Sequence, residues 1–291
     1  ATSVESTATP LSATVFLAVL AAALMHALWN VLLKVRIDRF ASISLMSFGT
    51  GLVAAPLLPF VSMPNGVTWA WICLSLCFHT GYKYYLTRAY ELGDLTLAYP
   101  LARGTAPLLT TIGGAILLGE APGPITLAGI VLLCGGVFLM SYRGGGKPDV
   151  FRGRAVFFAL LTSVFIAGYT ISDGSGARSA VDATSYAVWL FVLDGIWSMF
   201  FCIMLRGPKV IRIMLPEWRI GLLGGFLSGI AYWIAMWAMT KAPIAAVAAL
   251  RETSILFAML ISMVMLGEAI SRWRLLAALL IVSGVVALRL A

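Results

Sequence analysis

Three polar side chains recur at helical spacing inside one apolar stretch, and they are the residues of this sequence best suited to chemistry. His79, Tyr82 and Lys83 stand at positions i, i+3 and i+4, which share one face of a helix. Tyrosine and histidine each offer an apolar body with a hydrogen-bonding tip. Such a face predicts either the wall of a cavity that takes an amphipathic small molecule or a structural cluster of hydrogen bonds between helices.

Other ionisable residues also lie within apolar stretches, where a charge costs on the order of 3 kcal/mol unless it faces a cavity or a partner. These candidates are His26, Arg103, Asp173, Asp194, Arg251 and Glu252, with Asn30 as a neutral companion of His26. Arg103 and Arg251 could each clamp a carboxylate or, with Glu252, brace a gate. Asp194 lies in the middle of its stretch and is the candidate proton site if transport is coupled to protons.

Aromatic residues supply the other half of the candidate site. Tyr99 precedes Pro100, and a proline can break a membrane helix and so open a binding site. Tyr232 and Trp237 lie deep in a later apolar stretch. Core packing is the more common explanation for any one of these rings, but together with Tyr82 they predict an aromatic-lined cavity.

The elements that must position these residues are membrane-spanning helices. Of the 291 residues, 61% are apolar and only 11% are charged, far below the charged share of a soluble domain. A spanning helix needs about 20 apolar residues, so the chain holds about ten spans and no soluble domain. They are expected near 12–33, 41–61, 68–90, 95–118, 124–142, 155–173, 184–205, 219–239, 244–266 and 273–290.

Several function classes lack their machinery. The net charge of +8 is scattered singly through short loops, which argues against a nucleic-acid partner. The four cysteines lie in apolar runs, and Cys73, Cys77 and His79 make a poor zinc pattern, so neither a disulfide nor a metal site is expected. No hydrolase, metalloprotease or phosphate-loop motif occurs, which indicates that the protein is not an enzyme and needs no cofactor. The stretch before the first span lacks the basic start of a cleaved signal peptide, so that span is expected to be retained.

An internal repeat divides the chain. A shift of 148 residues places Leu118-Gly119-Glu120 on Leu266-Gly267-Glu268 without a gap. The same shift superposes Arg103 on Arg251, Thr105 on Thr253 and Gly136 on Gly284. The expected division is a first five-helix repeat over 1–142, a cytoplasmic linker over 143–154 and a second five-helix repeat over 155–291. Because five spans is an odd number, the second half must enter the membrane from the opposite side, which gives an inverted repeat.

Loop charges predict the orientation. Alternate loops carry fourteen Lys and Arg residues on one side and three on the other. By the positive-inside rule the first side is cytoplasmic, so both termini are expected in the periplasm of a bacterial cell, with the chain in the inner membrane.

The two Leu-Gly-Glu tripeptides and the two halves of five spans resemble the drug/metabolite transporter superfamily, in its EamA-type branch. The runs 26–30 (His-Ala-Leu-Trp-Asn) and 169–174 (Tyr-Thr-Ile-Ser-Asp-Gly), with Arg178, look like an exporter subgroup of that branch. Within it, the chain is most similar to bacterial aromatic amino acid exporters. The resemblance implies a basket-shaped helical bundle with a central cavity, export of amino acids and some hydrophobic cations, and no nucleotide hydrolysis.

These observations together predict an all-α, ATP-independent carrier that works by alternating access as a monomer in the lipid bilayer. The expected cargo is amino acids, aromatic or bulky apolar ones first, with threonine or methionine as further candidates. Tyr82, Tyr99, Tyr232 and Trp237 are expected to contact the side chain of the cargo. His79, Lys83 and Asn30, with His26 beside them, are expected to satisfy its polar end.

Two other classes stay open. An exporter of hydrophobic cations or drugs would place an unpaired carboxylate among aromatic rings, as Asp194 would if it faced Tyr232 and Trp237. A membrane enzyme acting on lipid-linked substrates would need a nucleophile with its base, or a metal constellation, at the membrane surface, and no such motif is visible.

Overall fold

Helices joined by short connections make up the part of the chain that the computed structural model describes, which is residues 11–32, 38–92, 95–143, 153–266 and 271–291. The first half contains α1 (Ala13–Leu32), α2 (Arg39–Ala54), the 3₁₀ helix η1 (Ala55–Phe60), α3 (Gly66–Leu92), α4 (Leu95–Leu118) and α5 (Pro124–Arg143). The second half contains α6 (Gly153–Ser179), α7 (Ala183–Arg206), α8 (Val210–Met214), the 3₁₀ helix η3 (Leu215–Glu217), α9 (Trp218–Met239), α10 (Ile244–Arg251), α11 (Ser254–Leu266) and α12 (Arg272–Leu290). The expected all-helical fold is therefore confirmed for the described residues.

Most of these helices are suited to a bilayer. Within the described part of the chain, seven helical runs are long and apolar enough to cross a membrane, and two shorter apolar helices cover 13–28 and 124–140. Helix α3 has 27 residues but is not one of the seven, because the polar residues on one of its faces lower its hydropathy. The third predicted span is thus the most polar helix of its length, as its histidine, lysine and tyrosines indicated.

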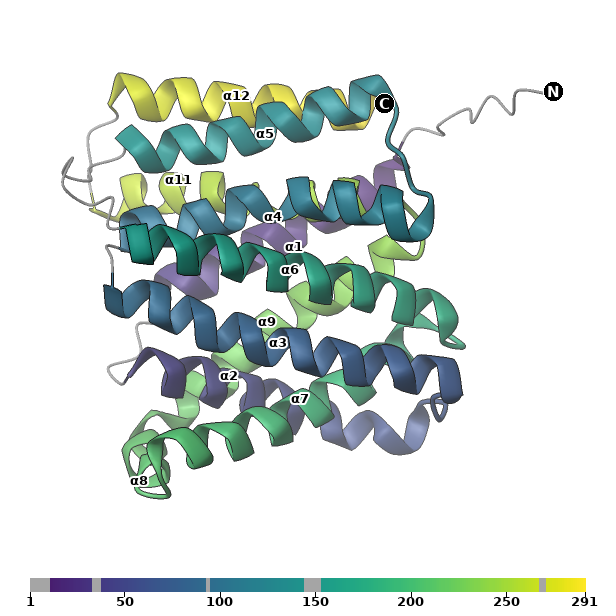
Figure 1. Cartoon of the computed structure of the whole chain (residues 1–291), viewed down its shortest axis with the longest axis vertical. Coiled ribbons are helices and arrows are strands. Elements are labelled where there is room, and N and C mark those ends of the chain that lie inside the picture. The colour runs from purple at the N-terminus through teal and green to yellow at the C-terminus, as the bar shows by residue number, and fades with distance from the viewer. Residues whose placement is uncertain (1–10, 33–37, 93–94, 144–152, 267–270) are drawn as a thin grey trace.

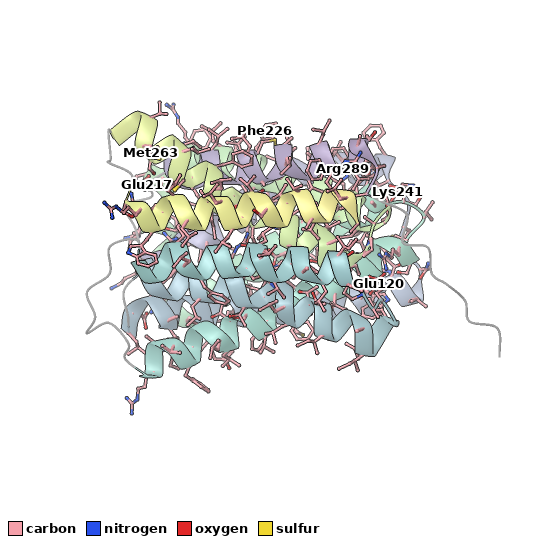
Figure 2. All side chains as sticks on the ribbon, turned by 90° about the horizontal axis from the view of Figure 1, so that it is seen from above. Glu120, Glu217, Phe226, Lys241, Met263 and Arg289 are labelled. Carbon is pink, nitrogen blue, oxygen red and sulfur yellow. The ribbon has the colours of Figure 1, made fainter. Side chains whose placement is uncertain are left out.

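The helices lie side by side along one direction (Figure 1). Helices α5 and α12 form one edge of the bundle, α2 and α7 lie towards the other, and α1, α3, α4, α6 and α9 fill the middle. The Arg289 side chain donates a hydrogen bond of 2.7 Å to the Leu11 carbonyl, so the two ends of the described chain meet. Figure 2 shows Glu120, Lys241 and Arg289 at this end of the bundle and Glu217 at the opposite end.

Glycines allow the closest helix contacts. A methyl group added at Gly136 of α5 would lie 2.7 Å from the Ala277 carbonyl oxygen of α12, and one added at Gly284 would lie 2.6 Å from the Gly129 carbonyl oxygen. Backbones approach this closely in membrane proteins only where both helices carry small residues. The two contacts are reciprocal in the 148-residue register, because that register places Gly136 on Gly284 and Gly129 on Ala277.

Pro100, which could have broken the fourth span, does not do so, because α4 continues through it. The proline follows the helix start at Leu95 by five residues, so only one backbone hydrogen bond near the helix end is lost.

The break lies instead in the predicted span 244–266, between α10 and α11. The amides of Glu252 and Thr253 bond to carbonyls three residues back, at 2.9 and 3.1 Å. The Thr253 hydroxyl also donates to the Leu250 carbonyl, at 2.7 Å. This tightened turn with a competing side chain ends α10 without glycine or proline.

Gly136 and Gly135 offer a matched test of the α5–α12 contact. We expect Gly136→Ala to lower the free energy of unfolding by about 1–3 kcal/mol, since the new methyl group meets backbone atoms of α12. Gly135→Ala should be neutral or slightly stabilising, because nothing lies within 4 Å of its added methyl group. Unfolding of both variants in detergent measures the difference. Equal stability of the two variants would contradict this packing.

Candidate functional site

A cavity of about 160 Å³ lies inside the bundle, where α1, α2, α3, α4, α6, α7, α9 and α10 converge. Its lining is His26, Ile43, Met46, Ser47, Thr50, His79, Tyr82, Lys83, Arg103, Tyr169, Leu190, Phe191, Asp194, Ser228, Gly229, Tyr232 and Arg251. Both halves of the chain contribute, and the lining combines aromatic, aliphatic, hydroxyl and charged groups. It can therefore surround an amphipathic small molecule.

The residues predicted from the sequence divide into three groups. His26, His79, Tyr82, Lys83 and Tyr232, together with Arg103, Arg251 and Asp194, line this cavity. Asn30 lines a neighbouring cavity that also includes His26. Trp237 packs against the apolar core instead of lining the cavity, and the side chain of Tyr99 lies outside the described residues.

Lys83 and Asp194 form a buried ion pair across α3 and α7. The Lys83 ammonium lies 2.7 Å from both carboxylate oxygens of Asp194 and also donates to the Ser198 hydroxyl. The side chains are only 5% and 14% exposed. The alternative of a cation exporter would need an unpaired carboxylate at position 194, and this ion pair argues against it. Lys83 lines the cavity as predicted, and its contact with the cargo stays a prediction. The pairing partner lies 111 residues away, beyond the reach of local patterns.

Asp173 is the carboxylate that lies among aromatic rings. It is fully buried and accepts hydrogen bonds from the hydroxyls of Ser75, Tyr186 and Tyr232, while His79 Nε2 lies 3.2 Å from its second oxygen. This one side chain of α6 therefore ties together α3, α7 and α9. One usable signal for this cluster was present in the sequence, because Ser75 stands four residues before His79 on the same helical face. Tyr186 carries no such signal.

At the helix break between α10 and α11, the adjacent residues Arg251 and Glu252 face different surroundings. Glu252 accepts a hydrogen bond of 3.0 Å from Arg103 Nε, and both side chains are about 5% exposed. Arg251 lies over the ring of Tyr232, with its guanidinium carbon 4.7 Å from the ring centre. No described carboxylate forms an ion pair with Arg251. The cavity thus contains one guanidinium whose charge has no anionic partner among the described side chains.

Stacked aromatic rings form one wall. The His79 ring lies parallel to that of Tyr169, with centres 4.2 Å apart, and Tyr82 meets Tyr169 edge-on at 5.6 Å. Phe191 of α7 lies 6.3 Å from the Tyr232 ring on the other side. Sequence reasoning missed Tyr169 and Phe191 as lining residues, although Tyr169 stands four residues before Asp173 on one face of α6.

A cluster of contacts closes the bundle at the end where the chain termini meet. Arg178 pairs with Glu120 and donates to the carbonyls of Met239 (2.8 Å) and Ala242 (3.0 Å). Glu120 also accepts from the Ile244 amide at the start of α10, at 3.1 Å. Glu120 thus ties the turn after α4 to the start of α10, and its counterpart in the repeat, Glu268, lies outside the described residues. Within those residues, no three His, Cys, Asp or Glu side chains gather to hold a metal ion.

The profile described as the EamA-like transporter family matches the chain twice, over residues 13–142 and 153–290. The chain belongs to the EamA-like transporter family. The expected EamA-type membership is thereby confirmed, and it indicates a multi-pass membrane protein from a family of small-metabolite transporters.

Solved structures share the EamA fold of this chain. One protein of known crystal structure superposes with a TM-score of 0.77 at 20% sequence identity, covering 94% of this chain and 97% of its own. At that identity the likeness shows the fold alone. A search of curated protein sequences found no significant match.

The Lys83–Asp194 pair should stabilise this EamA bundle only while both partners are present. We expect Asp194→Asn or Lys83→Met alone to destabilise the protein by about 3–5 kcal/mol, because each leaves a buried charge without its partner. The double variant should recover most of the loss. Thermal unfolding of all three in detergent measures this coupling, and additive losses in the double variant would show that the two charges do not interact.

Proposed function

We propose that this EamA protein exports amino acids, above all aromatic or bulky apolar ones, by ATP-independent alternating access. The observation that carries the proposal is the Arg251 guanidinium, which lines an aromatic cavity and has no carboxylate partner among the described residues. A guanidinium in a site of low dielectric needs an anion, and the carboxylate of an amino acid fits it with two parallel hydrogen bonds.

The other lining groups match the rest of an amino acid. Asp194 remains 14% exposed within its pair with Lys83 and lines the cavity, so its carboxylate can accept from the cargo's ammonium group. Tyr82, Tyr169 and Phe191 offer ring faces and edges to an aromatic side chain. Arg251 thereby takes over the role that the sequence suggested for Lys83.

Charge favours a zwitterion over a hydrophobic cation. Of the three cationic groups in the lining, Lys83 pairs with Asp194 and Arg103 pairs with Glu252, which leaves the charge of Arg251 in excess among the described residues. A cationic drug would face this excess of positive charge without an unpaired carboxylate. An amino acid brings its own anion.

The two halves support alternating access. In our proposal, residues 1–142 and 155–291 are inverted repeats joined by the linker 143–154, and they rock about the cavity as a monomer. The family profile matches once in each half, and the contacts between α5 and α12 are reciprocal. The end rich in Lys and Arg would face the cytoplasm, with both termini in the periplasm and the chain in a bacterial inner membrane.

Arg251 gives the first test. We expect Arg251→Gln to lower uptake of labelled phenylalanine into proteoliposomes at least about tenfold, because the cargo's carboxylate loses its charged partner. Arg251→Lys should retain part of the uptake, since the lysine ammonium keeps the positive charge but cannot form the two parallel hydrogen bonds of a guanidinium. Arg289→Gln removes an arginine at the far end of the bundle and serves as the charge-matched control.

The same assay with threonine, tryptophan and methyl viologen decides the substrate class. Saturable uptake of amino acids that Arg251→Gln abolishes and Arg289→Gln preserves supports the proposal. Uptake of methyl viologen alone would overturn it in favour of a cation exporter, and amino acid uptake that survives Arg251→Gln would overturn the role of Arg251.

Tyr82 gives a second test, of selectivity. Tyr82→Ala should lower phenylalanine uptake by about 2–10-fold relative to threonine uptake, because one ring–ring contact is lost for the aromatic cargo only. Trp237→Ala, in the packed core, should leave the ratio of the two unchanged. Competition between the two labelled substrates measures the ratio directly. A ratio that shifts equally in both variants would place Tyr82 outside the recognition surface.

A further inference from the structure

A second cavity, of about 190 Å³, adjoins the central one. Its lining is His26, Ala27, Asn30, Arg39, Tyr90, Ser254, Ile255 and Ala258. Arg39 begins α2, directly after Asp38, which pairs with Arg206, so this cavity lies towards the end of the bundle that gathers basic residues. His26 lines both cavities and is their common wall.

Three polar side chains that line this second cavity each have a hydrogen-bonding or charged group with no hydrogen-bond or ion-pair partner among the described residues. Ser254 is only 3% exposed, and its hydroxyl has no hydrogen-bond partner among the described residues. Asn30 donates one amide hydrogen bond of 2.8 Å to the His26 carbonyl, and its amide oxygen accepts from none of the described side chains. The Arg39 guanidinium lies 5.1 Å from the centre of the Tyr90 ring and pairs with no described carboxylate.

The helix break between α10 and α11 also places the N-terminus of α11 at the second cavity. Helix α11 has 13 residues and begins at Ser254, and the first turn of a helix carries partial positive charge. Ser254 and Ala258 stand four residues apart on one face of α11. The ring of Tyr90, together with Ala258 and Ile255, adds apolar surface to the lining of the cavity.

We propose that this second cavity is an access subsite, which binds the carboxylate of the cargo before the cargo reaches Arg251. The inference rests on the proposed function, since it concerns the same amino acids on the same path. The α11 start and Arg39 supply positive charge for a carboxylate, and Ser254 and Asn30 supply hydrogen bonds for the polar end of a zwitterion. Each chain then holds two amino acids in sequence, separated by His26.

Equilibrium binding of labelled phenylalanine to the full chain in lipid nanodiscs tests the subsite. The wild type should saturate near two molecules per chain, and Arg251→Gln should leave one. Ser254→Leu fills the second cavity and should also leave one, with the central affinity unchanged. Ser283→Leu makes the same substitution at an exposed position of α12 and should keep two. Arg39→Gln, at an exposed residue, should weaken the second site alone by at least tenfold.

The outcomes separate this inference from the proposed function. One molecule per wild-type chain, lost in Arg251→Gln and unchanged in Ser254→Leu and Arg39→Gln, overturns the access subsite and leaves amino acid transport standing. Two molecules in the wild type that persist in both Ser254→Leu and Arg39→Gln also overturn the subsite. A wild type that neither binds nor transports phenylalanine or threonine overturns the proposed function and the subsite with it.

Discussion

Charged groups inside a membrane bundle must find their partners within the protein, and this constraint organises the whole structure. Asp173, Asp194 and Glu252 lie in a low-dielectric interior, where an unpaired charge costs several kcal/mol. Each is satisfied from helices far away in the sequence: Asp173 by Ser75 and His79, Asp194 by Lys83, and Glu252 by Arg103. The separations of 94 to 149 residues mean that these contacts join the first half of the chain to the second.

The same constraint explains why the central cavity contains the positive charge of Arg251. Glu252 forms its ion pair with Arg103, so its neighbour Arg251 forms none with a described carboxylate and lies over the Tyr232 ring. The tight turn at Glu252 and Thr253 turns these adjacent side chains to different partners and starts a new helix at Ser254. One break thus produces both a guanidinium in the central cavity and a positive helix end at the second cavity.

Apolar runs, spacing and the repeat were sufficient to predict the helices and many lining residues. The face formed by His79, Tyr82 and Lys83 was visible because helical spacing is a local property. The pairing of Lys83 with Asp194 could not be predicted, because no local pattern encodes a contact over 111 residues. Proline was a poor guide to the broken helix, since α4 tolerates Pro100 near its start, whereas a tight turn with a competing threonine hydroxyl ends α10. Nor could sequence tell that Trp237 faces the core while Phe191 faces the cavity.

The two kinds of charge contact differ in what they cost to break, and this decides which part of the bundle can move. Glu120 and Arg178, which close the end where the termini meet, remain 23% and 32% exposed, so water can replace their contact at a cost of about 0–1 kcal/mol. The buried pairs Lys83–Asp194 and Arg103–Glu252 would each cost about 3–5 kcal/mol to separate. In the alternating-access cycle that we propose, we therefore expect the exposed cluster to open while the buried pairs hold the two halves together around the cargo.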